Sequence, residues 1–192
     1  MPRVVLFNKP YGVICQFSPS AGKRTLKDFV PITGIYPAGR LDTDSEGLLI
    51  LTDDGTLQNA ISHPAKKCPK TYWVQVENIP DEAALMRLRN GVDLGDFVSA
   101  PATVNQIAEP PGLWTRTPPI RFRQSIPTSW LEIAITEGKN RQIRRMTAAA
   151  GFPTLRLIRH RIARWTLAGL GSGEFRLLPA EEMRLWSNRP DL

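Results

Sequence analysis

Short apolar runs of strand length, separated by turn residues, dominate the pattern of hydrophobic positions along this chain. Runs or alternations of this kind predict strands, because successive side chains of a strand point to opposite faces. They fall at residues 3–8, 48–52, 71–77, 103–107, 129–136, 154–163 and 175–178. Helical spacing or capping residues predict helices at 56–62, 81–90 and 141–150, with a short closing helix at 179–186. The chain is therefore expected to mix strands and helices.

Two of the predicted helices are amphipathic, and the second also carries a cluster of arginines. In the helix at 81–90, Leu85, Leu88 and Met86 are expected to face the core. Asn140 suits the N-cap of the helix at 141–150, and Gly151 suits the position after its last turn. One face would pack on the core and the opposite face would hold guanidinium groups: Ile143, Met146 and Ala150 against Arg141, Arg144 and Arg145. No acidic residue falls on that arginine face.

A polar loop between Gly39 and Gly47 leads directly into the strand predicted at 48–52. It holds one arginine and three carboxylates: Arg40, Asp42, Asp44 and Glu46. A solvated surface loop would need no function. A calcium loop would use these carboxylates and Asp53, but it requires a helix on each side, where a Pro-Ala-Gly sequence and a strand are expected. A catalytic loop would use Asp42 with Arg40 nearby, held rigidly at the end of a buried strand.

Length and composition narrow the classes of protein that fit. The 192 residues suffice for one compact domain or two lobes sharing a core, and 42% hydrophobic residues suffice for that core. No apolar stretch is long enough to cross a membrane, and the N-terminus does not resemble a signal peptide. Cys15 and Cys68 lie far apart without metal-binding spacing, so both are expected to be buried thiols of a cytoplasmic protein.

Acidic and basic residues are segregated along the chain. Residues 41–65 hold five carboxylates and no Lys or Arg, whereas residues 139–164 hold eight bases and no carboxylate, within a net charge of +7. Seven of those eight bases are arginines, whose guanidinium fork binds phosphate bidentately, so a polyanionic partner is predicted. The segment at 109–128 interleaves five prolines with Trp114, Arg116, Arg121 and Arg123. We expect a rigid insert that suits single-stranded RNA.

Four motifs resemble those of RNA pseudouridine synthases, in the branch that modifies ribosomal RNA. The two long motifs are Gly-Arg-Leu-Asp with Asp-Ser-Glu-Gly-Leu-Leu at 39–49, and Glu-Gly-Lys-Asn-Arg-Gln-Ile-Arg-Arg-Met at 137–146. The two short motifs are Asn-Lys-Pro-Tyr-Gly at 8–12 and Lys-Thr-Tyr at 70–72. The proline-rich insert also resembles that of one subgroup, which acts on the large ribosomal subunit.

The resemblance implies an α+β fold. A central, mostly antiparallel mixed sheet would be flanked by helices, with an active cleft across the sheet. Residues 1–192 would form a single catalytic domain of two lobes sharing one sheet. The N-terminal RNA-binding module of the S4 type, which many relatives carry, would be absent, and the protein would be a monomer.

The resemblance also implies the reaction and its residues. A specific uridine in a single-stranded region or loop of large-subunit ribosomal RNA would be isomerised to pseudouridine. Asp42 would be the catalytic carboxylate, Arg144 would pair with it, and Tyr72 would stack on the flipped base. RNA would be bound by Lys9, Arg40, Lys70, Lys139, Arg141, Arg145, Arg159 and Arg161. No redox step occurs and no atom is lost, so no cofactor or metal is expected. Asp42 would either attack covalently or take a sugar proton.

Two other classes of protein remain open. A ribosome-binding protein that kept the fold without the activity would have no reason to retain both Asp42 and Arg144. A glycosidic hydrolase would need a pair of carboxylates such as Asp42 and Asp44, which alternation in a short loop would aim apart. Conversion of uridine within intact RNA would exclude the hydrolase, whereas release of free uracil would support it.

Overall fold

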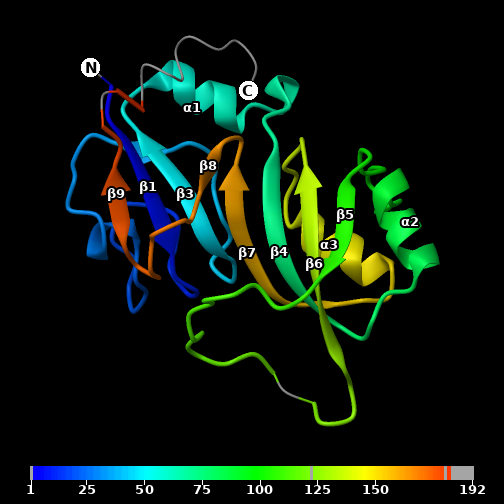
Figure 1. The fold of residues 1–192 in the computed structure, drawn as a ribbon. Helices are drawn as coiled ribbons and strands as arrows, with labels where there is room; N and C mark the ends of the chain where they lie inside the picture. The colour runs from blue at the N-terminus through cyan, green and yellow to red at the C-terminus, as the bar shows by residue number, and fades with distance from the viewer. Residues whose placement is uncertain (1, 122, 180, 183–192) are drawn as a thin grey trace. The chain divides into compact units, whose positions relative to one another are not determined.

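The computed structural model describes residues 2–121, 123–179 and 181–182 (Figure 1). The predicted closing helix at 179–186 lies largely outside the described residues. The chain divides into two compact units, one formed by Met1–Cys68 with Arg159–Leu192 and the other by Pro69–Ile158. Strand β7 (Thr154–Ile162) contributes residues to both units. A mostly antiparallel sheet with flanking helices confirms the predicted α+β fold.

The first unit is built on β1 and β3, in which every residue is buried. Its strands follow the order β7-β3-β1-β9, with β2 paired to β3 and β8 paired to β7. The core on one side of β1 and β3 includes Phe7, Leu26, Ile35 and Leu49. Its elements besides β7 are β1 (Val4–Lys9), the 3-10 helix η1 (Leu26–Asp28), β2 (Tyr36–Pro37), β3 (Glu46–Thr52), α1 (Gly55–Ser62), the 3-10 helix η2 (Pro64–Lys66), β8 (Trp165–Thr166) and β9 (Phe175–Leu177).

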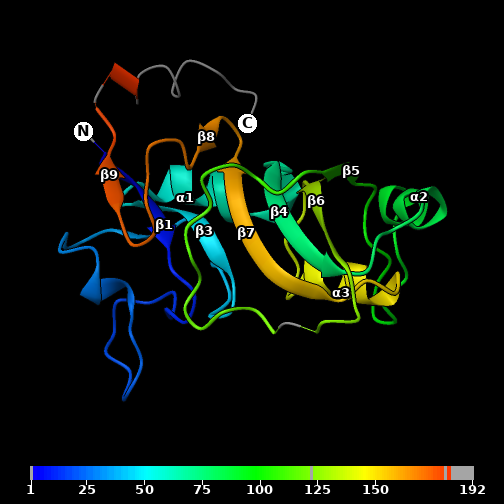
Figure 2. The ribbon, with the colours of Figure 1, turned by 60° about the horizontal axis from the view of Figure 1, so that its bottom comes forward.

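The second unit is a sheet with the strand order β5-β6-β4-β7. Strands β4 and β6 pair antiparallel with Val74 opposite Leu131. Helix α3 lies behind β6 and β5 in Figure 1 and below β6 in Figure 2, so it covers one face of this sheet. The other elements of the unit are β4 (Lys70–Glu77), α2 (Glu82–Asn90), β5 (Thr103–Ile107), β6 (Thr128–Ile135) and α3 (Gln142–Ala149).

Several details differ from the sequence-based expectations. Helix α3 begins at Gln142, with Arg141 rather than Asn140 at its N-cap. Met86 is 44% exposed, although Leu85 and Leu88 are buried as predicted. Cys68 is buried, whereas Cys15 is only half-buried. Within the described part of the chain, no helix is long and apolar enough to span a lipid bilayer.

Candidate active site

The loop that carries Asp42 connects β2 to β3 in the first unit. Pro37 of β2 pairs with Leu51 of β3, so the sheet fixes both ends of the connection. Within the loop, the Ser45 amide donates to the main-chain oxygen of Asp42 (3.1 Å) and closes a turn. The Asp42 residue is half-buried and Arg40 is exposed. The calcium-loop interpretation does not fit, because strands rather than helices flank the loop.

Arg159 of β7 contacts the main chain at both ends of this loop. Its Nε donates to the Leu48 carbonyl (2.8 Å) and its Nη1 to the Arg40 carbonyl (3.4 Å). The residue is 3% exposed, and its Nη2 is buried with no hydrogen-bond partner among the described residues. A Cβ at Gly47 would lie 2.4 Å from the main-chain oxygen of Arg159, so only glycine permits this close approach. One planar guanidinium can serve two carbonyls because it offers five donors.

Lys9 ends β1 and is fully buried in the same unit. Its Nζ donates to the carbonyls of Pro10 (3.0 Å) and Val13 (2.8 Å), which closes the turn of the Asn-Lys-Pro-Tyr-Gly motif. From this turn, the Gly12 amide donates to the Thr43 carbonyl (2.8 Å). The turn therefore supports the Asp42 loop at its middle. Burial lowers the pKa of Lys9 to about 8.

In the second unit, Glu137 and Gln142 shape the segment that leads into α3. The Glu137 carboxylate accepts hydrogen bonds from the Gln142 side-chain amide and from the Ala100 main-chain amide, the latter at 2.8 Å. The Gln142 side-chain oxygen accepts from the Lys139 amide (3.1 Å). Together they hold a turn in which Arg141 has a positive φ of 50° at the helix N-terminus. These contacts explain why the motif carries a glutamate and a glutamine five residues apart.

Helix α3 presents the two faces that its sequence predicts. Ile143, Met146 and Ala150 are buried against the core of the unit. Arg144 is half-buried, and its Nη1 lies 3.5 Å from the Thr154 carbonyl of β7. The helix therefore docks through its apolar side and keeps Arg144 next to the sheet.

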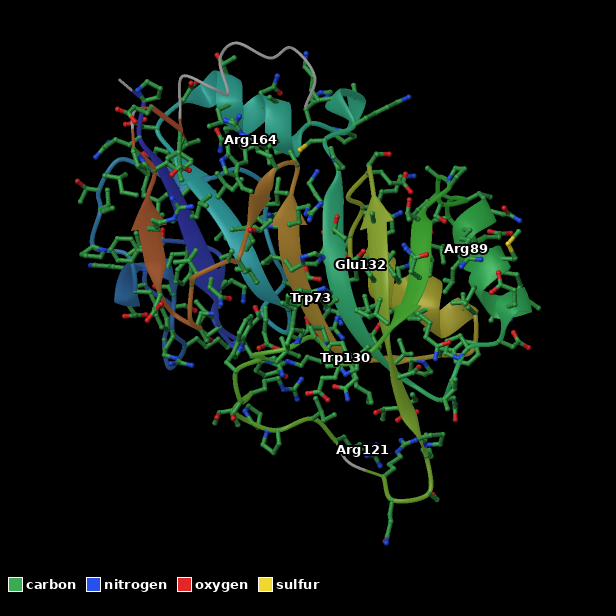
Figure 3. All side chains as sticks on the ribbon, in the orientation of Figure 1. Trp73, Arg89, Arg121, Trp130, Glu132 and Arg164 are labelled. Carbon is green, nitrogen blue, oxygen red and sulfur yellow. The ribbon has the colours of Figure 1, made fainter. Side chains whose placement is uncertain are left out.

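Tyr72 lies in the middle of β4, in a strand whose residues alternate between buried and half-buried. Tyr72 and Lys70 are 7% and 8% exposed and share the buried face with Val74. The register places Tyr72 opposite Ile133 of β6. On the other face, Trp73 of β4 lies opposite Glu132 of β6, and both residues are labelled in Figure 3. The sheet therefore fixes the direction of the Tyr72 ring.

A hairpin around Phe97 lies against the basic residues near α3, and sequence reasoning missed it. The Lys139 ammonium lies 3.6 Å and the Arg145 guanidinium 5.1 Å from the centroid of the Phe97 ring. Arg145 also donates to the Leu94 carbonyl (2.8 Å) and pairs with the Asp96 carboxylate. That hydrogen-bonded pair lowers the pKa of Asp96 and raises the pKa of Arg145. The expectation that this arginine face meets no acid is wrong for Arg145.

The proline-rich insert between β5 and β6 is tied to the second unit by two arginines. The Arg116 guanidinium donates to three carbonyls, those of Pro118 (2.8 Å), Pro119 (2.9 Å) and Leu155 (3.2 Å). Arg156 donates to the Trp114 carbonyl (3.0 Å) and stacks on its ring at 5.5 Å. Arg121 is exposed on the insert (Figure 3). Arg116 and Arg156 therefore bind main-chain carbonyls of the protein itself and fix the insert to the second unit.

The predicted RNA-binding residues differ in their exposure. Arg40, Lys139, Arg141 and Arg161 are exposed, Arg145 is half-buried, and Lys9, Lys70 and Arg159 are buried. Within the first unit, Arg159 contacts the main chain on both sides of Asp42, and Lys9 contacts the turn whose Gly12 amide bonds to Thr43. Within the second unit, it gathers the bases from Lys139 to Arg145 at the start of α3. The sequence identified these basic residues, but it did not indicate which of them are buried.

Comparison with known proteins identifies the family. The model of the RNA pseudouridylate synthase family matches residues 3–149. A crystal structure described as that of a pseudouridylate synthase has a TM-score of 0.78 at 27% identity, covering 96% of this chain and 73% of the other. The chain belongs to the RNA pseudouridylate synthase family, whose members are isomerases that act on RNA.

The relatives within this family agree with the subgroup that the insert resembles. Ribosomal large subunit pseudouridine synthase E of Vibrio vulnificus (strain CMCP6) is 54% identical over 174 residues, which cover 91% of this chain and 74% of that protein. The enzyme of the same name from Xanthomonas campestris pv. campestris is 52% identical over 183 residues, covering 94% and 98%. Ribosomal large subunit pseudouridine synthase B of Bacillus subtilis (strain 168) is 35% identical over 186 residues, covering 95% and 70%. The motifs therefore predicted the family correctly.

Proposed function

We propose that this protein isomerises a specific uridine of large-subunit ribosomal RNA to pseudouridine, with Asp42 as its catalytic carboxylate. The observation that carries the proposal is the Asp42 loop, whose half-buried carboxylate sits on main chain fixed by β2, β3 and the Gly12 turn. A rigid loop of this kind suits a reaction in which one side chain must be placed accurately against the sugar or base. The names of relatives that are 54% and 52% identical over the aligned residues support large-subunit RNA as the substrate.

The reaction breaks the bond between uracil N1 and ribose C1′ and forms a bond between C5 and C1′. The proton on C5 is lost and N1 gains one, so the product is an isomer and no redox partner is needed. Asp42 either attacks C1′ as a nucleophile or takes a proton from the sugar. Both roles require an ionised carboxylate that is held in place, which the loop supplies.

Tyr72 and Arg144 are the other two residues that we propose to act in the reaction. Tyr72 stacks on the uracil ring once the nucleotide leaves its stack, because an extruded base needs a new aromatic surface. Arg144 pairs with Asp42 and orients its carboxylate. Both assignments rest on their positions in the family motifs. The exposed bases Arg40, Lys139, Arg141 and Arg161 hold phosphates, and phosphate contacts position the RNA without reading its sequence.

The test maps pseudouridine by carbodiimide labelling and primer extension on unmodified large-subunit ribosomal RNA. We expect one new stop with the wild-type protein and a loss of at least about 1,000-fold in rate with Asp42→Asn, because the carboxylate is removed at nearly constant shape. Asp44→Asn is the matched control, since it makes the same change two residues away in the same loop. It is expected to keep the activity.

The other outcomes separate the alternatives. Equal activity of wild type and Asp42→Asn would remove Asp42 from the mechanism. No stop with either protein, on naked RNA and on assembling particles, would favour a ribosome-binding protein without this activity. Release of free uracil that depends on both Asp42 and Asp44 would favour a hydrolase.

A further inference from the structure

Arg159 is a charged residue in the interior of the first unit that the proposed mechanism leaves without a role. Its two hydrogen bonds reach the carbonyls of Arg40 (3.4 Å) and Leu48 (2.8 Å), which flank residues 41–47. One side chain therefore holds both ends of the segment that contains Asp42.

We propose that Arg159 is a positioning residue for the isomerisation, which sets the shape of the loop and thereby the direction of the Asp42 carboxylate. The inference rests on the proposed catalytic role of Asp42. It differs from the phosphate-binding role that the sequence predicts for Arg159, because a residue that is 3% exposed in this unit has little surface to offer RNA. Arg159 then acts through the main chain of the loop.

The charge itself argues against a role in packing alone. A buried guanidinium is costly to desolvate unless its donors are paired, and apolar residues of similar size often stabilise such sites better. Arg159 keeps one buried donor, Nη2, without a partner among the described residues. If this position contributed only to stability, we would expect Nη2 to have a hydrogen-bond partner or an apolar residue to stand in place of Arg159. The planar fork that spans two carbonyls is what an apolar side chain cannot supply.

The main chain reinforces the contact made by the side chain. Gly47 has a φ of +104°, and a Cβ there would meet the Arg159 main-chain oxygen, nitrogen and carbon at 2.4, 2.9 and 3.0 Å. Strands β3 and β7 therefore fit together at Gly47 without space for any other residue. Since Leu48 follows immediately, the start of β3 is fixed by main-chain and side-chain contacts to one residue of β7.

The experiment compares Arg159→Lys and Arg159→Met with the wild type in single-turnover reactions at saturating RNA. Lysine keeps the charge but is a compact point charge that lacks the fork. We expect both variants to lose about 100-fold in rate, because a displacement of about 1 Å at a reacting group has an effect of that size. The dissociation constant for RNA should stay within about twofold of the wild-type value, since no phosphate contact is removed. Arg24→Met, on an exposed arginine of the same unit, is the charge-matched control and should keep the wild-type rate.

Hydrogen exchange supplies a readout that a general loss of stability would not give. The amides of Ser45 and Gly12 bond to the loop at Asp42 and Thr43, and they should exchange faster in Arg159→Lys while the amides of β1 keep their protection. The rates are measured at a temperature well below the unfolding midpoint of each variant. If Arg159 contributed only to stability, the variants would be folded and fully active at that temperature. If Arg159→Met does not fold, Arg159→Lys alone decides.

Two results would overturn the inference. One is a wild-type rate in Arg159→Lys, with unchanged exchange in the loop. The other is weaker RNA binding with an unchanged rate at saturation, which would return Arg159 to the RNA-binding residues. Asp42→Asn is measured in parallel. Full activity of that variant would show that the proposed function of Asp42 has failed, whatever Arg159 does.

Discussion

Lys9 carries an ammonium group into the interior of the first unit, at the end of a strand that is buried along its whole length. Burial removes the water that would solvate this charge, and two carbonyls replace only part of it. Desolvation is therefore the largest cause of its pKa of about 8, and the nearby carboxylates Glu46 and Asp44 oppose it. Because of this shift, the free energy of unfolding should depend on pH.

We predict that the wild-type protein gains stability relative to Lys9→Met as the pH rises from 8 to 10.5. In this window the unfolded chain still binds the lysine proton that the folded protein has released, so unfolding becomes less favourable as pH rises. The gain is about 3 kcal/mol over the full window. Urea denaturation of both proteins at intervals across this range measures it.

Both proteins are made in a Cys15→Ser background, because Lys9 lowers the pKa of that thiol and the thiol raises the pKa of Lys9, so the two titrations are coupled. Burial raises the pKa of that thiol, which gives the opposite slope in the same range. If the urea midpoints of the two proteins change equally with pH, the pKa of Lys9 is not lower in the folded protein than in the unfolded chain. The prediction would then be wrong.

The sequence motifs identified the important basic residues, but they did not predict whether each one is buried or exposed. Lys9 and Arg159 lie in basic or motif sequences, so the sequence assigns both to RNA, whereas the structure buries both. The physical reason is that consecutive residues are buried along all of β1 and most of β7, so both faces of each strand are covered. Single-sequence alternation does not reveal which strands are central.

At the scale of elements, the hairpin at 93–98 changes what the basic end of α3 offers to a ligand. Asp93 and Val98 form an isolated bridge, and the Asp93 carboxylate accepts from the Gly95 amide (2.9 Å), which closes the hairpin. This geometry brings the Asp96 carboxylate to the Arg145 guanidinium. A phosphate approaching Arg145 must therefore compete with a carboxylate of the same protein.

We predict that Asp96→Asn binds RNA more tightly than the wild type. The substitution frees Arg145 for a phosphate, and each phosphate contact added on a single strand steepens the dependence of log affinity on log salt concentration by about 0.7. Titrations of labelled RNA at several salt concentrations measure both the affinity and the slope. Because the pair is solvent-exposed, the unfolding midpoint should change little.

Asp93→Asn is the matched control for this prediction. It removes the same charge from the same hairpin, but Asp93 bonds to the hairpin's own main chain rather than to Arg145. Equal gains in affinity from both variants would show that only the overall charge of the hairpin matters, and the specific competition at Arg145 would be wrong.

Element type was predictable where the hydrophobic pattern is long, and not where it is short. Strand β5 has the predicted bounds, and β4 and β6 differ by a residue at their ends. Strands β2 and β8 have two residues each, too few to produce an alternation, and each is held by pairing with a longer neighbour. The hairpin that carries Asp96 and Phe97 was missed for a similar reason, since its contacts with α3 join residues far apart in sequence.

At the scale of the whole molecule, the residues proposed as catalytic or positioning belong to different units of one chain. Asp42 and Arg159 belong to the first unit, and Tyr72 and Arg144 to the second. The order of the motifs predicted the family and thus the fold, because these motifs are specific combinations of residue types. The division of β7 between the two units was not predictable, since its sequence is continuous across Ile158 and Arg159.

If Arg159 and Arg144 both act on Asp42, as we propose, substitutions at the two arginines should not be additive. We predict that Arg159→Lys with Arg144→Lys slows the single-turnover reaction less than the product of the separate effects, because Arg144 contributes less once the carboxylate is already displaced. The interaction should lie between about 0.5 and 3 kcal/mol, the range for residues that share a partner. Four proteins, measured at saturating RNA, close the cycle.

A second cycle of Arg159→Lys with Asp96→Asn is the control, because Asp96 is proposed to act on RNA affinity and not on Asp42. That pair should be additive within about 0.5 kcal/mol. Additivity in both cycles would mean that Arg159 and Arg144 do not act on a common group, and the proposed pairing of Arg144 with Asp42 would have to be abandoned. Coupling in the first cycle alone would show that Arg159 and Arg144 both act on the Asp42 carboxylate.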